Sequence, residues 1–314
     1  DNLLMMLGRK WTINPKNNLV FGDQYLNMEN MILSDGFRNI ELNDISNNKG
    51  LSLDIDNFDL DFINGIIKYD KMNFTGLSSI SARVPDVFSE QKEISAYINV
   101  PEFFINKDKY GAVYIDVNKA PGKPFKANVS IGDFLAINGT YDEKLKVIDS
   151  RVKLREAPMS LIQYLLKDGI SNTKGYINAD ITFAGPLKAP TLIGTGTVNK
   201  GQTRINYTGA TYFFDNQKLL LTNTEINLDG AELKDENGNI GTVRGGLVHD
   251  LFRKFGVNAT ISGNNVIGLN TTKKDNPDYY GFGVGRLSAE FQGSFDRINM
   301  KISAVTGPGT KLLI

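Results

Sequence analysis

The sequence predicts an all-β protein: a long curled antiparallel-rich sheet folded over an apolar groove, with one short amphipathic helix. Apolar and polar residues alternate with a period of two along most of the 314 residues, the pattern of strands that have one buried and one solvated face. Residues that favour tight turns separate these runs, for example Asn138-Gly139, Gly185-Pro186, Asp229-Gly230 and Asn237-Gly238. We therefore expect a meander of antiparallel strands.

The predicted strands follow one another closely along the chain. Their apolar residues stand two positions apart, and they are Leu51, Leu53 and Ile55; Phe58, Leu60 and Phe62; Val113, Ile115 and Val117; Val129 and Ile131; Ile177, Ala179, Ile181 and Phe183; Ile205 and Tyr207; Ile226 and Leu228; Val257, Ala259 and Ile261; Leu287, Ala289 and Phe291; and Ile298, Met300 and Ile302. Strands at such spacing number about 25 in a chain of this length. Because open sheets of more than roughly 10 strands curl, split or close, a curled sheet, a barrel and a solenoid stay open, each with a continuous apolar inner face.

Residues 158–168 break the two-residue period and predict a short amphipathic helix. Pro158 suits the first turn of a helix and Gly169 its end. Residues 247–255 have apolar spacing that fits a helix and also fits a strand followed by a turn, and both interpretations stay open. The helix at 158–168 marks the region, near 150–170, where the otherwise continuous segment 1–314 could divide. Its apolar face carries Leu161, Ile162, Leu165 and Leu166.

The composition excludes several classes of function. Thirty-five basic residues balance 35 acidic ones, so no net charge directs the chain to nucleic acid or to an acidic membrane surface. The absence of cysteine excludes disulfides, thiolate catalysis and cysteine metal sites. No run approaches the roughly 20 apolar residues of a membrane-spanning helix, and the strand pattern is unfinished at both ends. We therefore expect a piece of a longer, membrane-tethered protein.

The only histidine, His249, stands beside Asp250, and the two could form an acid–base pair. No serine nucleophile motif and no partner at metal-ligand spacing accompany His249. This isolation favours a role in a turn or a cap over a role in catalysis.

Two acidic stretches and two glycine-rich stretches resemble ligand loops without matching them. The segments DIDNFDLDF and DENGN lack the full calcium-ligand pattern with its distal glutamate. We interpret the first as the solvated face of a strand and the second as a hairpin turn. GTGTVNKG and GFGVG do not open a helix, which phosphate-binding loops require. We therefore predict no enzyme, no catalytic residue, no cofactor and no metal site.

Three segments carry a resemblance to a known family. GYINADITFAGPLKAPTLIGTGTVNKGQTRINYTGATYFF resembles the repeating β unit of the TamB proteins, subunits of the bacterial translocation and assembly module that belong with the AsmA-like proteins. The later NTTKKDN, YYG, FQGSFD and GPGTKLLI motifs are similar, in the same order, to the C-terminal half of TamB-like proteins of the Bacteroidetes type. WTINPKNNLVFGDQYLNMENMILSDG also resembles a TamB repeat. The likeness covers most of the chain and is looser between about 50 and 150.

The resemblance implies a fold called the β-taco, in which a long sheet encloses an apolar groove. It implies a periplasmic protein of a Gram-negative bacterium, tethered to the inner membrane by a segment absent from this chain. The implied partners are a BamA-like or TamA-like outer-membrane barrel, phospholipid and nascent outer-membrane proteins. The implied functions are phospholipid conduction between the membranes and support of outer-membrane protein assembly.

Inward-facing apolar residues are the candidate lining of a lipid groove. Burial of an acyl chain there gains about 0.8 kcal/mol per CH₂, and a uniform lining lets the chain slide. The same residues could equally form the dry core of a sandwich or barrel. The candidates are Ile177, Ile181, Phe183, Ile205, Tyr207, Ile226, Leu228, Val257, Ile261, Leu287, Phe291, Met300 and Ile302.

Two other functions remain open on the sequence. An exposed sheet edge could pair with strands of outer-membrane proteins, which would make the chain a scaffold or chaperone without lipid conduction. Alternatively, the chain could be an extracellular β-solenoid adhesin that binds carbohydrate, although Trp11 is the only tryptophan available for stacking on a sugar.

Overall fold

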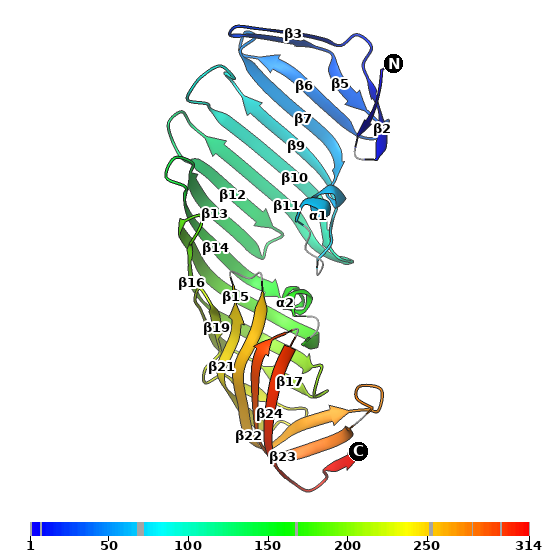
Figure 1. Cartoon of the computed structure of the whole chain (residues 1–314), viewed down its shortest axis with the longest axis vertical. Coiled ribbons are helices and arrows are strands. Elements are labelled where there is room, and N and C mark those ends of the chain that lie inside the picture. Colours follow the sequence, from blue (N-terminus) through cyan, green and yellow to red (C-terminus); the bar gives the residue numbers. More distant parts are fainter. Residues whose placement is uncertain are drawn as a thin grey trace. The chain divides into compact units, whose positions relative to one another are not determined.

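The computed structural model confirms an all-β protein built from antiparallel, curled sheet with two short helices (Figure 1). It describes residues 2–6, 8–67, 72–166, 169–250, 254–277, 279–295 and 297–313. The chain forms two compact units. Unit 1 comprises Asp1–Arg151 and Ala184–Pro190, and unit 2 comprises Val152–Phe183 and Thr191–Ile314. No helix among the described residues is long and apolar enough to cross a membrane.

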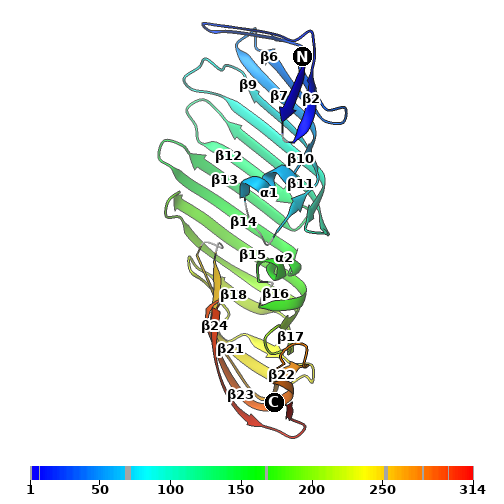
Figure 2. The same cartoon turned by 45° about the vertical axis from the view of Figure 1, so that its right-hand side comes forward.

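Unit 1 is a meander in which most strands pair with their neighbours in the chain. From β6 to β13 the strands lie side by side in both views (Figures 1 and 2), and β3 and β4 form a separate hairpin. The elements are β1 (Leu3–Met6), β2 (Arg9–Ile13), β3 (Asn18–Gly22), β4 (Tyr25–Glu29), β5 (Met31–Ser34), β6 (Asn39–Ile45), β7 (Gly50–Asp59), α1 (Asp61–Ile67), β8 (Phe74–Thr75), β9 (Leu77–Val84), β10 (Ile94–Ile105), β11 (Asp108–Lys119), β12 (Phe125–Ile131) and β13 (Leu135–Asp142).

Two long strands, β14 (Val147–Pro158) and β15 (Ile170–Pro186), contribute residues to both units. The remaining elements belong to unit 2, and they are α2 (Ser160–Leu165), β16 (Thr191–Ile205), β17 (Thr211–Phe214), β18 (Gln217–Leu221), β19 (Glu225–Asn227), β20 (Glu232–Lys234), β21 (Ile240–His249), β22 (Phe255–Thr271), β23 (Tyr280–Ser294), β24 (Arg297–Thr306) and β25 (Lys311–Leu313). In unit 2, β16 pairs with β18 along one half and with β17 along the other. Strands β21 to β24 pair in sequence.

Unit 2 contains a packed apolar core. Val266 and Ile267 are almost fully buried where the pairing of β22 with β23 shifts register. The cluster is Ala210, Tyr212, Leu233, Val243, Ile261, Val266 and Ile267. A register shift leaves strand backbone groups without their ladder partners, and two polar side chains bond them here. The Asp235 carboxylate accepts from the Ile267 amide, and the Tyr212 hydroxyl donates to the Ile267 carbonyl.

The helix predicted at 158–168 is confirmed as α2, over Ser160–Leu165, with residues 167 and 168 outside the described part of the chain. The prediction of a strand through Phe58, Leu60 and Phe62 is wrong, because β7 ends at Asp59 and α1 begins at Asp61. Asn57 has a φ of 56° and the β7–β9 register shifts there, which interrupts the ladder. Of the two interpretations of 247–255, the strand holds for residues 247–249, which end β21, and residues 251–253 lie outside the described residues.

The connections through α1 and α2 have the same local structure, displaced by 99 residues in the sequence. Leu60 N donates to Gly76 O at 3.0 Å, and Met159 N donates to Gly175 O at 3.0 Å. The next turn repeats as well, because Ile63 N donates to Leu60 O and Ile162 N donates to Met159 O. The described parts of the two segments therefore share one hydrogen-bond pattern, in which a strand is followed by a helix and a second strand.

Side chains and strained backbone positions repeat at the same displacement. The Asn64 side chain accepts from Phe74 N at 2.8 Å, and the Gln163 side chain accepts from Thr173 N at 2.8 Å. Non-glycine residues with positive φ precede both helices at equivalent positions, Asn57 and Glu156. The sequence identity between the two segments is too low to show the repeat without the hydrogen bonds.

Candidate functional site

One face of the unit 1 sheet carries an unbroken row of aliphatic side chains. Residues directly opposite each other in an antiparallel pair point to the same face, so the register connects one residue from each of nine strands. Seven of the nine are isoleucine. We call this set the apolar row: Ile13, Leu33, Ile40, Ile55, Ile80, Ile98, Ile115, Val129 and Ile137.

All nine side chains of the apolar row are partly exposed, and none is fully buried. No described element of unit 1 therefore covers the row as a second sheet would. At about 4.8 Å between strands, the row extends for about 38 Å along the sheet. A continuous aliphatic surface of this length that remains in contact with solvent is unusual, and such surfaces typically bind an apolar partner.

A second row lies two residues along each strand from the apolar row. Its side chains are smaller over β9 to β13. We call the five residues of this part the small-residue strip: Ala82, Ala96, Val117, Ala127 and Gly139. A further two residues along, the sheet carries Ile94 opposite Lys119 and Phe125 opposite Tyr141. The strip is therefore lower than the larger side chains on both sides of it.

The opposite face of the same strands is polar. Ser81 pairs with Asp54 and Tyr97, and Asp116 pairs with Asn128. The two faces of unit 1 therefore differ sharply in chemistry.

The end of the apolar face next to α1 is packed rather than open. Val100 and Ser78 are almost fully buried there, and the Phe74 and Phe103 rings stack at 6.0 Å between centroids. The Phe62 ring of α1 lies edge-on to Phe58 at 5.8 Å. This end of the sheet therefore has a small core of its own.

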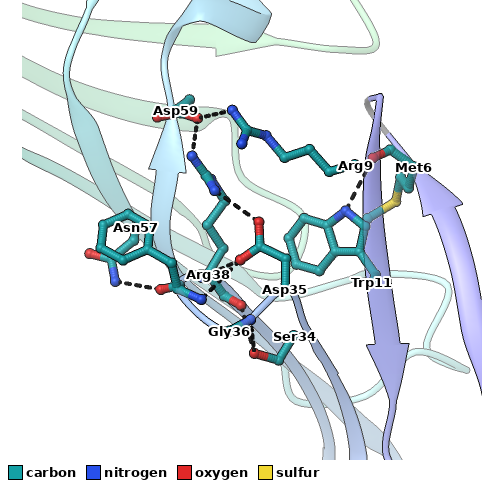
Figure 3. Close-up of polar contacts among 10 residues, drawn as sticks. Met6, Arg9, Trp11, Ser34, Asp35, Gly36, Arg38, Asn57 and Asp59 are labelled. Carbon is teal, nitrogen blue, oxygen red and sulfur yellow. Dashed lines mark hydrogen bonds and ion pairs between the residues drawn. The ribbon is translucent and has the colours of Figure 1, made fainter.

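The N-terminal end of unit 1 is held by an ion-pair network (Figure 3). The Arg38 guanidinium bonds the carboxylates of Asp35, at 2.8 Å, and of Asp59, which also accepts from Arg9 at 3.0 Å. The network links β2, the β5–β6 turn and β7. Trp11, 1% exposed, donates from its indole N–H to the Met6 carbonyl at 3.1 Å.

The electrostatics of this network lower the pKa of Asp35 to about 2. The main cause is the Arg38 backbone amide, which donates to the carboxylate. The Phe37 amide and the Arg38 guanidinium contribute further, and together these effects outweigh desolvation.

Asp59, an acid of the DIDNFDLDF stretch, forms ion pairs with two arginines, Arg9 and Arg38. Asp54 and Asp56 lie on the polar face, as expected for a solvated strand face. No group of three potential metal ligands occurs among the described residues.

The DENGN stretch forms the predicted hairpin turn between β20 and β21. Asp235 is 2% exposed, and its carboxylate accepts from the amides of Asn237 and Asn239 within the turn and of Ile267 on β22. Gly238 has a φ of 82°, as the turn requires. Three backbone amides donate hydrogen bonds to this carboxylate, as expected for a residue that stabilises a turn.

His249 ends β21 and is 6% exposed, with its ring 6.1 Å from the Phe255 ring. Its backbone amide donates to Thr224 O, and Asp250 N donates to Lys254 O. Burial lowers the pKa of His249, against smaller opposing effects of Asp250 and Thr222. A buried position at the end of a strand is typical of a structural residue.

All thirteen lining candidates of the sequence lie in unit 2. The register places Ile226 with Val257, Ile261 with Ile302, and Phe291 with Met300 on one face. That face includes the core cluster: Ile261 belongs to it, and Ile205, Leu228 and Phe291 pack against it. Leu287 is buried, Ile177, Ile181 and Phe183 are partly exposed in β15, and Ile302 is 47% exposed.

Tyr207 is not on a strand, contrary to its pairing with Ile205 in the sequence pattern. Strand β16 ends at Ile205, and residues 206–208 form a turn. Gly209, with a φ of 67°, continues the turn, and its amide donates to Ile205 O. Tyr207 is 55% exposed and its hydroxyl bonds that of Tyr279.

A shallow hollow of about 540 Å³ lies in unit 2 beside the Arg155–Asp180 ion pair. Its lining combines polar side chains, such as Asn178 and Lys218, with the apolar side chains of Leu219 and Leu220.

No family model, no curated protein and no solved structure matches the chain. The assignment of a function therefore depends on the apolar row and the residues around it. The sequence did contain a signal for this row, since Leu51, Leu53 and Ile55, and Val113, Ile115 and Val117, follow the two-residue period.

Proposed function

We propose that the chain binds lipid acyl chains along the apolar row of unit 1 and conducts them along the sheet. The observation that carries this proposal is the row itself, nine aliphatic side chains on nine strands, each partly exposed. A sheet that serves only as scaffold has no need to keep such a surface in contact with water.

The energetics support binding without catalysis. Transfer of a CH₂ group out of water gains about 0.8 kcal/mol, so a sixteen-carbon tail that is half covered on one face gains about 6 kcal/mol. The row is also longer than one tail, which spans about 15 Å in one leaflet of a bilayer.

The uniformity of the row supports movement. Eight of the nine residues are isoleucine or valine, and they lie one strand apart. Each step of about 4.8 Å therefore exchanges one aliphatic contact for another of the same kind. A tail that slides along such a surface meets no charged side chain within the row.

We propose further that this activity serves a TamB-like function. In that setting the chain is a periplasmic bridge segment tethered to the inner membrane, phospholipid is the cargo, and a BamA-like barrel is the outer-membrane partner. The motif resemblance and the curled single-layer sheet of unit 1 support this placement.

The test is lipid carriage by matched variants of β10. Ile98→Asp places a charge on the apolar row, and Tyr97→Asp places the same charge on the polar face one residue away. Phospholipid that co-purifies is measured by native mass spectrometry, and transfer is measured between vesicles of fluorescent phosphatidylethanolamine. We expect wild type and Tyr97→Asp to carry lipid and Ile98→Asp to lose most of it while its melting temperature stays close to that of Tyr97→Asp. Lipid-free wild type, or equal carriage by the two variants, would overturn the proposal.

One observation favours a second function, a scaffold that accepts strands of other proteins. Strand β24 pairs only with β23 among the described residues, and nine of its ten residues are exposed. Unpaired edges of this kind accept additional strands. The test compares Ile302→Pro with Ser303→Pro. One of these variants removes a backbone N–H that faces β23, and the other removes a backbone N–H that faces away from β23. The proline variant that melts like wild type should lose binding of an amphipathic β-strand peptide if the edge is used.

A further inference from the structure

Lys119 is a cation at the rim of the apolar face of unit 1. It is opposite Ile94 at the end of β11, in the row next to the small-residue strip. Only 10% of its side chain is exposed, although lysine is among the residues least often buried. Its stem is therefore covered while its ammonium lies at the edge of an aliphatic surface.

Two groups contact this ammonium. Glu143, from the turn after β13, forms an ion pair with it, and the Phe125 ring lies under it at 4.9 Å from Nζ to the centroid. A cation above an aromatic ring is stabilised by the ring's negative face. The ammonium is thus fixed in position by the protein and is not a freely moving surface charge.

Glu143 is the replaceable member of the pair. Its side chain is 47% exposed, so its carboxylate can return to water at little cost. An anion that brings additional binding energy from elsewhere can therefore displace it from Lys119.

The small-residue strip supplies that binding energy. It passes beside Lys119 at its middle residue, Val117, which lies two positions from Lys119 on β11. From Val117 the strip extends through Ala96 to Ala82, two strand spacings or about 10 Å. Leu53 of β7, opposite Ala82, continues the row to about 14 Å, close to the roughly 15 Å of one leaflet's tail. An acyl chain on the strip contacts the larger side chains on both sides, Ile98 and Ile115 on one and Ile94 on the other.

We propose that Lys119 binds the anionic headgroup of an amphiphile whose single tail lies on the small-residue strip. The ligand class is a long-chain phosphate or carboxylate. Charge complementarity selects this class: the ammonium recognises the anion, and the strip recognises the tail. The inference rests on the proposed function, because it assigns the headgroup position on the same apolar face.

The experiment measures binding of twelve-carbon amphiphiles to the full chain by isothermal titration at pH 8. The probes are dodecyl phosphate, dodecanoate, 1-dodecanol and dodecyltrimethylammonium, the first two distinguishing a phosphate from a carboxylate ligand. The variants are Lys119→Met, which keeps an unbranched stem without the charge, Glu143→Gln, which removes the competing carboxylate, and Lys126→Met as control. Lys126 is exposed on the polar face of the next strand, opposite Asn118.

We expect Lys119→Met to weaken binding of the two anionic probes at least tenfold and to leave dodecanol binding within twofold of wild type. Glu143→Gln should tighten the anionic probes severalfold, and Lys126→Met should change none. Equal binding of the anions by wild type and Lys119→Met, or weaker binding by Glu143→Gln, would overturn the headgroup assignment alone. Failure of wild type to bind dodecanol and both anions would overturn the proposed function together with it.

Discussion

The carboxylate of Asp235 accepts a hydrogen bond from the backbone amide of Ile267, with 2.9 Å between Oδ2 and N. The two residues are 32 positions apart, and the bond fixes the β20–β21 turn to the point where β22 shifts register against β23. Tyr212 bonds the carbonyl of the same residue at 2.8 Å. Burial raises the pKa of Tyr212, with a further contribution from Asp235, so this hydroxyl remains a donor.

Replacement of Asp235 should destabilise unit 2 strongly. Asp235→Ala leaves the buried Ile267 amide without its acceptor, and hydrogen bonds to charged groups contribute about 1.5–3 kcal/mol each, so we expect a loss of about 3 kcal/mol. Asp235→Asn keeps one acceptor oxygen and should lose about half as much. Asp229→Ala is the control, because Asp229 is exposed and, in the described part of the chain, accepts a single hydrogen bond, from Gly245 N at 3.2 Å. Hydrogen exchange of the Ile267 amide measures the effect, and unchanged protection in Asp235→Ala would contradict it.

The repeated helix motif predicts related effects at Asn64 and Gln163. Asn64 accepts from Phe74 N and donates to Phe74 O, whereas Gln163 accepts from Thr173 N. At about 1 kcal/mol for each bond, Asn64→Ala should lose about twice the local stability that Gln163→Ala loses. Exchange rates of the Phe74 and Thr173 amides report the two losses. A variant that leaves its own amide protected as in wild type would show that the side chain does not hold the strand.

The fold class and α2 could be predicted from the sequence because they depend on local patterns. Alternation with a period of two reports strands wherever one face is apolar, and Pro158 and Gly169 delimit the helix between them. Helix α1 could not be predicted in the same way. Phe58, Leu60 and Phe62 alternate as a strand would, and only the positive φ of Asn57 shows that the ladder is interrupted there.

The apolar row could not be predicted because the sequence does not contain the register. Ile55, Ile80 and Ile98 each belong to an alternating run, yet only the pairing of β7, β9 and β10 places them in one line. The pattern also does not report whether a face is covered. Ile261 has the same alternation as Ile98, but Ile261 is part of a packed core and Ile98 is in contact with solvent.

Two glycines near α1 should respond to alanine with opposite signs. Gly76 has a φ of 147°, and a Cβ there would lie 2.5 Å from the Glu102 carbonyl oxygen, so Gly76→Ala should destabilise unit 1 by about 2 kcal/mol or more. Gly65 is inside α1 with open space around it, so Gly65→Ala should stabilise the helix by about 0.5–1 kcal/mol. Thermal melts of the two variants measure both effects. A stabilised Gly76→Ala protein would show that the left-handed conformation is not required.

The last prediction concerns pH and follows from the burial of His249. Because burial lowers its folded pKa below the usual 6.5, the unfolded chain binds more protons than the folded chain as the pH falls below about 6.5. The contribution of neutral His249 to stability is therefore fully present above that pH and is lost as the pH falls towards the lowered pKa.

We expect the melting temperature of wild type to fall between pH 7 and pH 5, and the fall to be smaller in His249→Gln, which stays neutral throughout. The carboxylates contribute to the slope in both proteins, so the difference between the two curves isolates the histidine. Asp35 does not interfere, because its pKa of about 2 places the loss of its contribution between about pH 3.8 and pH 2. Parallel curves for wild type and His249→Gln would show that His249 can accept a proton in the folded state as easily as in the unfolded chain.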